Sequence, residues 1–187
     1  MSYFPMMVDL EGKKVLVVGG GKEGELKVQV LHDFNAIITL ISIDATDKAK
    51  SMAHTLQQRE FLDSDVDAED YTLIVASTDD RQVNARISRL AKERKIPVNI
   101  VDDVELCTFI FPAIVKDGDV VCAVSSGGKS PYLVRHIKGL LKSVLPDNVG
   151  EINDEMGRIR EKARKEIPDT VQRRVYLRER LYDLLNK

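Results

Sequence analysis

The sequence has few cysteines, no long apolar run and no strong excess of charge of either sign. Its two cysteines, Cys107 and Cys122, are not spaced as metal ligands or as a redox pair, so we expect both to be small core residues in a reducing cytoplasm. No apolar run approaches the length of a membrane span, and residues 1–8 lack a basic leader. The net charge of −2 gives no reason to expect nucleic acid. We therefore expect neither a membrane nor a nucleic-acid partner.

The length and the apolar content are sufficient for one full α/β domain with a modest appendix. The chain has 187 residues, of which 43% are hydrophobic. Buried strands are predicted at 15–18, 37–41, 71–77 and 97–101, and helices at 22–34, 46–57 and 80–95. On the first helix we expect Leu26, Val30 and Leu31 at the core-facing positions. This alternation predicts a Rossmann-type parallel sheet over residues 1–112.

Three successive glycines follow the first predicted strand. Gly19, Gly21 and Gly24 fill the glycine positions of a G-x-G-x-x-G motif, which is typical of a dinucleotide-binding turn. The first glycine permits the turn, the second lets backbone amides approach a pyrophosphate, and the third lets the helix lie close to the strand. A glycine-rich turn without a ligand is the alternative. We predict that the cofactor-binding residues of this turn are Gly19, Gly20, Gly21, Lys22, Glu23 and Gly24.

An acidic residue follows the second predicted strand. Asp44 lies twenty residues after Gly24, where a carboxylate would accept hydrogen bonds from an adenosine ribose. Its alternative role is the N-cap of the next helix. No Arg or Lys follows Asp44 until Lys48, so nothing is obviously placed to bind a 2′-phosphate. The cofactor is therefore expected to be NAD in preference to NADP.

Small polar and acidic residues follow the next two strands. Ser77 and Thr78 end the third strand, where a cofactor would cross the carboxyl edge of the sheet. Asp102 and Asp103 follow the fourth strand and reach the same edge. Adjacent carboxylates on a loop are usually solvated turn residues, but this position makes a catalytic role worth testing.

The pattern changes after Phe109. Residues 109–115 and 119–125 predict two strands joined by an Asp-Gly turn, which is an antiparallel hairpin. Ser130 and Pro131 are then suited to the N-cap and first position of a helix that reaches Leu145. A hairpin and one helix make a poor free-standing domain, so we expect residues 113–146 to bury their apolar face against a second copy of the chain, as a homodimer. Two charged helices, divided near Pro168, complete a small helical domain at 147–187.

Taken together, these motifs resemble the precorrin-2 dehydrogenases, the family that includes the amino-terminal module of siroheme synthase. The segment that carries most of the resemblance is Ser-Ser-Gly-Gly-x-Ser-Pro, at residues 125–131, after the hairpin. The other matching motifs are Tyr3-Phe-Pro, Val18-Gly-Gly-Gly21 with Lys27, Ala76-Ser-Thr-Asp-Asp80 with Asn84, Asn99-Ile-Val-Asp102 and Phe109-Ile-Phe-Pro112. The family architecture is similar to the one predicted above: a nucleotide domain, an interlocked dimerisation segment and a small helical domain.

The resemblance implies a reaction and its residues. Such enzymes oxidise the tetrapyrrole precorrin-2 to sirohydrochlorin with NAD, and some members also insert ferrous iron to give siroheme. The important aspartate of the family falls on Asp102, which is suited to accept a proton. Ile43 and Asp44 match positions that hold the adenosine. The substrate-binding residues implied are Ser126, Gly127, Gly128, Lys129, Arg135 and His136, of which the cations, together with Lys138, would bind substrate carboxylates. For any one of these cations, an exposed helix face is the alternative.

Three expectations qualify this interpretation. Glu23 stands where the family often has an apolar residue, and its carboxylate would repel a pyrophosphate unless it points elsewhere. Because only His136 of the three histidines lies near the substrate segment, and has cationic neighbours, we expect weak or no ferrochelatase activity and no bound metal. The alternative function is a non-catalytic NAD-sensing module, which would need neither Asp102 nor the segment 126–131.

Overall fold

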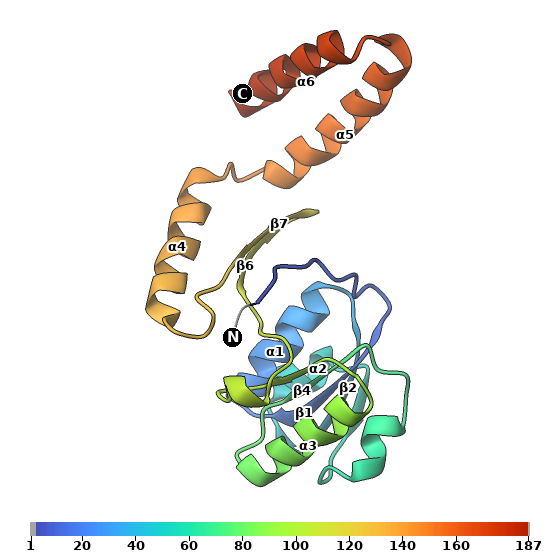
Figure 1. Ribbon diagram of the computed structural model, residues 1–187, viewed down its shortest axis with the longest axis vertical. Coiled ribbons are helices and arrows are strands. Elements are labelled where there is room, and N and C mark those ends of the chain that lie inside the picture. The colour runs from blue at the N-terminus through green and yellow to red at the C-terminus, as the bar shows by residue number, and fades with distance from the viewer. Residues whose placement is uncertain (1–2, 187) are drawn as a thin grey trace. The chain divides into compact units, whose positions relative to one another are not determined.

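The computed structural model describes residues 3–186, which divide into two compact units (Figure 1). The first unit ends at Phe111 and the second begins at Pro112. The elements of the first unit are β1 (Lys14–Gly20), α1 (Lys22–Asp33), β2 (Ile37–Ala45), α2 (Asp47–Met52), β3 (Thr55–Gln57), the 3-10 helix η1 (Asp63–Asp67), β4 (Leu73–Ala76), α3 (Arg81–Glu93), β5 (Val98–Ile100) and the 3-10 helix η2 (Val104–Leu106).

The five strands of the first unit form one parallel sheet in the order β3-β2-β1-β4-β5. From β1 the chain proceeds to β2 on one side and later to β4 on the other, so the direction of winding reverses between β1 and β4. Ligands of open α/β sheets bind at such a reversal, at the carboxyl ends of the strands. The predicted Rossmann-type fold is confirmed.

Both faces of this sheet are buried. Alternate residues of β1 point to opposite faces, so Leu16 and Val18 pack with Ile87 of α3 in one cluster, whereas Val15 and Val17 belong to a second cluster below α1. The two helices accordingly cover opposite faces of the sheet (Figure 1). Continuous apolar strands, as in residues 15–18, are typical of parallel sheets covered on both sides.

The predicted helix at residues 46–57 is wrong in its second half. α2 ends at Met52, Ala53 is extended, and residues 55–57 form β3. The strand forms because Thr55–Gln57 pairs with β2, and its three residues carry no periodic signal of their own. His54, predicted on that helix, instead lies between α2 and β3, where its Nδ1 accepts a hydrogen bond from the backbone N–H of Ile38 at 3.1 Å.

The core-facing positions predicted on the first helix also need correction. The buried residues of α1 are Gly24, Val28 and Leu31, at the spacing i, i+4 and i+7. Leu31 was predicted there, but Leu26 is 56% exposed and Val30 is only partly buried. Gly24 sets this orientation, because its lack of a side chain allows that edge of the helix to approach the sheet most closely.

The second unit contains a hairpin and three helices. Its elements are β6 (Ala113–Asp117), β7 (Val120–Val124), α4 (Pro131–Val144), α5 (Val149–Glu166) and α6 (Thr170–Leu185). β6 and β7 are antiparallel and are joined through Gly118, whose φ is +53°. α4 packs against both strands, and α5 packs against α6. No helix in the described part of the chain has the length and apolarity that a membrane span requires.

Candidate dinucleotide site

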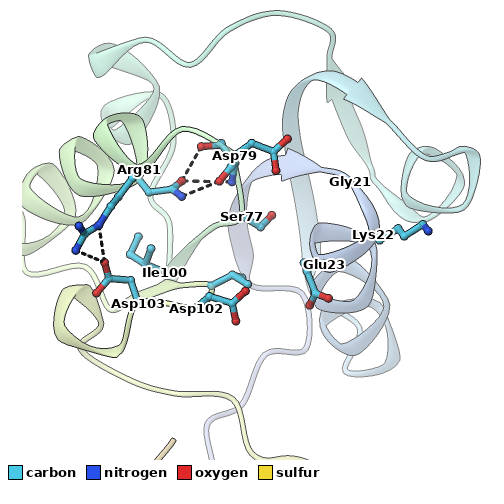
Figure 2. A pocket seen from close by; sticks show the side chains of 12 residues that line it. Gly21, Lys22, Glu23, Ser77, Asp79, Arg81, Ile100, Asp102 and Asp103 are labelled. Carbon is cyan, nitrogen blue, oxygen red and sulfur yellow. Dashed lines mark hydrogen bonds and ion pairs between the residues drawn. The ribbon is translucent and has the colours of Figure 1, made fainter.

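A pocket opens at the carboxyl ends of β1, β4 and β5, beside the reversal of the sheet (Figure 2). The loops that follow parallel strands all lie at the carboxyl edge of the sheet, so segments that are distant in sequence meet here. Its lining residues are Gly21, Lys22, Glu23, Ser77, Thr78, Asp79, Arg81, Asn84, Ile100, Val101, Asp102 and Asp103. The pocket therefore joins the glycine turn, the β4 exit and the β5 exit, as predicted from the sequence.

The glycines of the turn have different reasons for being glycine. Gly19 has a φ of +99°, and a Cβ there would lie 2.6 Å from the carbonyl carbon and oxygen of Ser77. A Cβ at Gly24 would collide with the carbonyl oxygen of Gly19, and one at Gly20 with the side chain of Ala45. Gly21 is different, because nothing lies within 4 Å of its missing Cβ. The packing of the protein therefore requires Gly19, Gly20 and Gly24 but not Gly21.

The open position at Gly21 fits a bound pyrophosphate. Gly21 is the N-cap of α1 and offers no side chain to accept hydrogen bonds from the first-turn amides. These amides and the helix dipole attract an anion, and the missing side chain lets a phosphate approach the backbone. The residues present thus fit the dinucleotide that the glycine pattern predicts, with the pyrophosphate at the amino end of α1.

The end of β2 is tied to the glycine turn by Ser42, which the sequence analysis missed. The N–H of Gly20 donates to Ser42 Oγ at 2.9 Å, and that hydroxyl donates to the carbonyl of Asp44 at 2.5 Å. Ile43 and Asp44 are both exposed here, beside the turn and outside the lining of the pocket. The N-cap of α2 is Thr46, not Asp44, since Thr46 Oγ1 accepts from the N–H of Ala49. Asp44 is thus free of the capping role.

Ser77 and Thr78 form the wall between the glycine turn and α3. Ser77 Oγ donates to the carbonyl of Gly19 at 2.9 Å. Thr78 Oγ1 donates to Asn84 Oδ1 at 2.8 Å, and Asn84 Nδ2 donates to the carbonyl of Thr78 at 2.8 Å. Both hydroxyl groups therefore form hydrogen bonds within the protein. The cofactor contacts predicted for Ser77 and Thr78 would then be made by their backbone atoms and by packing. Asn84 was noted only as part of the family motif, and its buried amide orders this wall.

The two carboxylates after β5 have different environments. Asp103 accepts from Arg81, with 3.2 Å between the Arg81 Nη2 and Asp103 Oδ2 atoms (Figure 2). Among the residues that the structure describes, none hydrogen-bonds or ion-pairs with the Asp102 carboxylate, which lines the pocket. Asp102 has a φ of +61°, a left-handed backbone that Asp adopts more readily than most residues. Asp102 is therefore presented to the pocket while Asp103 is held by α3.

Cys107 anchors this turn from below. Its thiol accepts from the N–H of Ile100 at 3.1 Å and lies within hydrogen-bond reach of the carbonyl oxygens of Ile100 and Asp103, at 3.2 and 3.3 Å. Burial raises the pKa of the Cys107 thiol, which keeps it neutral and unreactive. Cys107 is therefore a core residue, as predicted, and its thiol also holds the backbone on either side of Asp102.

The predicted substrate-binding residues belong to the second unit. Ser126 Oγ accepts from the N–H of Ser130 at 2.9 Å, which closes the loop before α4, and Gly127 and Gly128 both have positive φ. Ser130 caps α4 as predicted. The basic side chains among them, Lys129, Arg135 and His136, are exposed, and Arg135 lies 5.9 Å from the ring centroid of Tyr132. Within residues 3–186 no group of three or more His, Cys, Asp or Glu is arranged to hold a metal ion.

Comparison with known proteins connects this site to a family. The family described as "Putative NAD(P)-binding" matches residues 6–113. Siroheme synthase of Pseudomonas fluorescens is 37% identical over 96% of this chain, and that of Azotobacter vinelandii is 36% identical over the same share. The chain spans 39% of the length of each. A solved structure named SirC, precorrin-2 dehydrogenase, matches 99% of this chain and 100% of its own, with a TM-score of 0.69 and 23% identity. The resemblance found in the sequence motifs is confirmed.

Proposed function

This chain belongs to that NAD(P)-binding family, and from this premise we propose that it catalyses the NAD-dependent oxidation of precorrin-2 to sirohydrochlorin in siroheme biosynthesis. The observation that carries the proposal is Asp102, an unpaired carboxylate in the pocket that also holds the glycine turn. The names of the relatives, siroheme synthase and precorrin-2 dehydrogenase, support this substrate class. A module that only senses NAD would have no use for a carboxylate presented in this way.

Different residues of the pocket serve the separate steps of a dehydrogenation. When bound, NAD supplies the hydride acceptor. The amino end of α1 holds the pyrophosphate, and the wall of Ser77 and Thr78 borders the bound dinucleotide. Asp102 accepts the proton that leaves the substrate, since it is the one of the two β5-exit carboxylates without a protein partner. The rigid turn around Cys107 keeps that carboxylate in place.

We propose that the substrate is bound through Ser126, Gly127, Gly128 and the cations Lys129, Arg135 and His136. The helix N-terminus at Ser130 and the exposed cations suit the acetate and propionate groups around the rim of a tetrapyrrole. We also propose a cytoplasmic homodimer through residues 113–146, without a membrane or nucleic-acid partner. Any insertion of ferrous iron into sirohydrochlorin is expected to be weak, because the cationic neighbours of His136 repel a metal ion.

NAD is expected to be preferred over NADP. The carboxylate of Asp44 is exposed beside the glycine turn and would repel a 2′-phosphate. Lys48, the first cation after Asp44, lies 3.8 Å from Glu25, measured from Nζ to Oε1, so it is already paired. Dissociation constants measured by calorimetry should therefore be lower for NAD than for NADP. Equal affinities for both would contradict this, and Asp44→Asn should narrow the difference.

The proposed reaction is tested by adding precorrin-2 and NAD to the purified chain under anaerobic conditions. The result expected is NADH formed in step with the sirohydrochlorin spectrum, both above a control without protein. Binding of NAD without either product would instead identify a sensing module. Adding ferrous ion after completion measures metal insertion separately, through the siroheme spectrum.

A further inference from the structure

Glu23 places a negative charge in the part of the pocket where a dinucleotide needs a positive one. It is in the first turn of α1, two residues after Gly21, and it lines the pocket. In Figure 2 its side chain points to the same side of the pocket as the Asp102 carboxylate. A carboxylate here opposes the approach of a pyrophosphate to the helix N-terminus unless another charge compensates it.

Lys27 lies one helical turn after Glu23, on the same face of α1. Glu followed by Lys at i+4 is the favourable order for attraction between the two side chains. The Nζ atom of Lys27 is 4.9 Å from the centroid of the Phe111 ring, which fixes the direction of this long side chain. Lys27 is also partly buried. Burial lowers the pKa of Lys27, and the charges of Glu23 and Asp102 act in the opposite direction.

The other cations near the pocket do not take this position. Lys22 lines the pocket, but Figure 2 shows its side chain pointing outward, away from Glu23 and Asp102. Arg81 is paired with Asp103 on the opposite wall. The charged and titratable groups that face this part of the first unit are Lys22, Glu23, Lys27, Asp79, Arg81, Asp102, Asp103 and Cys107.

We propose that Lys27 is a positioning residue of the dinucleotide site, whose ammonium compensates the Glu23 carboxylate and so lets the pyrophosphate reach the amino end of α1. Lys27 acts through Glu23 and need not touch the cofactor. The inference rests on NAD binding alone and not on the oxidation of precorrin-2. It also explains how this chain retains a dinucleotide site with a carboxylate inside its glycine motif.

The test is a double-mutant cycle on NAD affinity, measured by calorimetry at low ionic strength. Lys27→Met keeps the apolar stem over Phe111 and removes the charge, so NAD should bind about three- to tenfold more weakly. Glu23→Gln alone should bind NAD more tightly than the unchanged protein, because the carboxylate that opposes the pyrophosphate is removed. The double variant Lys27→Met with Glu23→Gln should return to within about twofold of Glu23→Gln, because the carboxylate that Lys27 compensates is then absent.

Controls separate this effect from net charge and from folding. Lys13→Met removes an exposed lysine directly before β1 and should leave NAD affinity unchanged. Thermal unfolding without NAD identifies any variant that fails to fold, and Lys27→Arg should retain affinity. Unchanged affinity in Lys27→Met would overturn the proposal, as would a double variant as weak as Lys27→Met. If precorrin-2 is not oxidised but the cycle shows this coupling, the inference stands and only the proposed reaction fails.

Discussion

In the glycine turn, some glycines are required for packing, whereas Gly21 is suited to cofactor binding. Gly19, Gly20 and Gly24 are enclosed by backbone or side-chain atoms, whereas the position of a Cβ on Gly21 is open. The motif spacing predicts separate roles for Gly19, Gly21 and Gly24, but not the packing role of Gly20, because the atoms nearest to its missing Cβ belong to Ala45 at the end of β2. Substitutions in the turn should therefore have two distinct outcomes.

Gly24→Ala should destabilise the fold, and Gly21→Ala should not. A methyl group at residue 24 collides with the backbone oxygen of Gly19, which cannot move without opening the turn, so we expect a loss of about 2–4 kcal/mol. Gly21 has an ordinary φ of −67°, so Ala should cost less than about 1 kcal/mol at this N-cap but should weaken NAD binding. Denaturant unfolding and NAD titration measure the two effects. Equal stability losses in both variants would contradict this assignment.

At the scale of the element, sequence patterns predicted the strands and helices that carry their own signal. β1, β4, β5, α1 and α3 lie where the apolar patterns placed them, because a buried parallel strand or an amphipathic helix shows its period in its own residues. β3 was missed because its three residues become a strand only by pairing with β2. The left-handed backbone of Asp102 and its anchoring by Cys107 were also beyond prediction, since both arise from contacts made after β5 has joined the sheet.

The η1 segment contains a buried carboxylate, Asp65, that is paired with the partly exposed Arg59. Both guanidinium Nη atoms of Arg59 donate to the carboxylate of Asp65, at 2.6 and 2.7 Å, and the N–H of Leu62 donates to the same group. Burial alone would raise the pKa of Asp65, whose side chain is only 7% exposed, but these hydrogen bonds and the Arg59 charge outweigh it and lower the pKa below its ordinary 3.8. A carboxyl with a lowered folded-state pKa stabilises the fold above its unfolded pKa, and that contribution disappears as the pH falls through the folded value.

Asp65→Asn should therefore reduce the free energy of unfolding by about 1–3 kcal/mol near neutral pH. The difference from the unchanged protein should shrink as the pH falls below about 4, where Asp65 of the unfolded chain takes up a proton, and should vanish once the pH falls through the lower pKa of the folded state. Denaturant unfolding of both proteins, from neutral pH to below about 4, measures this difference in the free energy of unfolding. Asp67→Asn is the matched control, since Asp67 also lies in η1 and pairs with Arg94 after α3 but is 54% exposed, so its loss should matter less. A difference that persists undiminished at low pH would refute the linkage.

For the whole molecule, the second unit is expected to complete its core by dimerisation. α4 and α6 have no buried residue, although α4 carries the exposed apolar side chains Tyr132, Leu133, Leu140 and Val144. Apolar surface of this kind is normally covered. Sedimentation at micromolar concentration should show a homodimer, and Leu140→Asp should shift it toward monomer. A monomer at all concentrations would contradict the predicted role of residues 113–146.

The central claim, that Asp102 accepts the substrate proton beside bound NAD, is tested most directly by Asp102→Asn. Asn tolerates the left-handed backbone at φ +61°, so the turn is retained while the carboxylate is lost. With precorrin-2 and NAD under anaerobic conditions, the initial rate of NADH formation should fall by about 10²–10⁴-fold. NAD affinity should stay within about twofold of the unchanged protein, and the exposed control Asp70→Asn should retain full turnover. A rate for Asp102→Asn close to that of the unchanged protein would contradict the account.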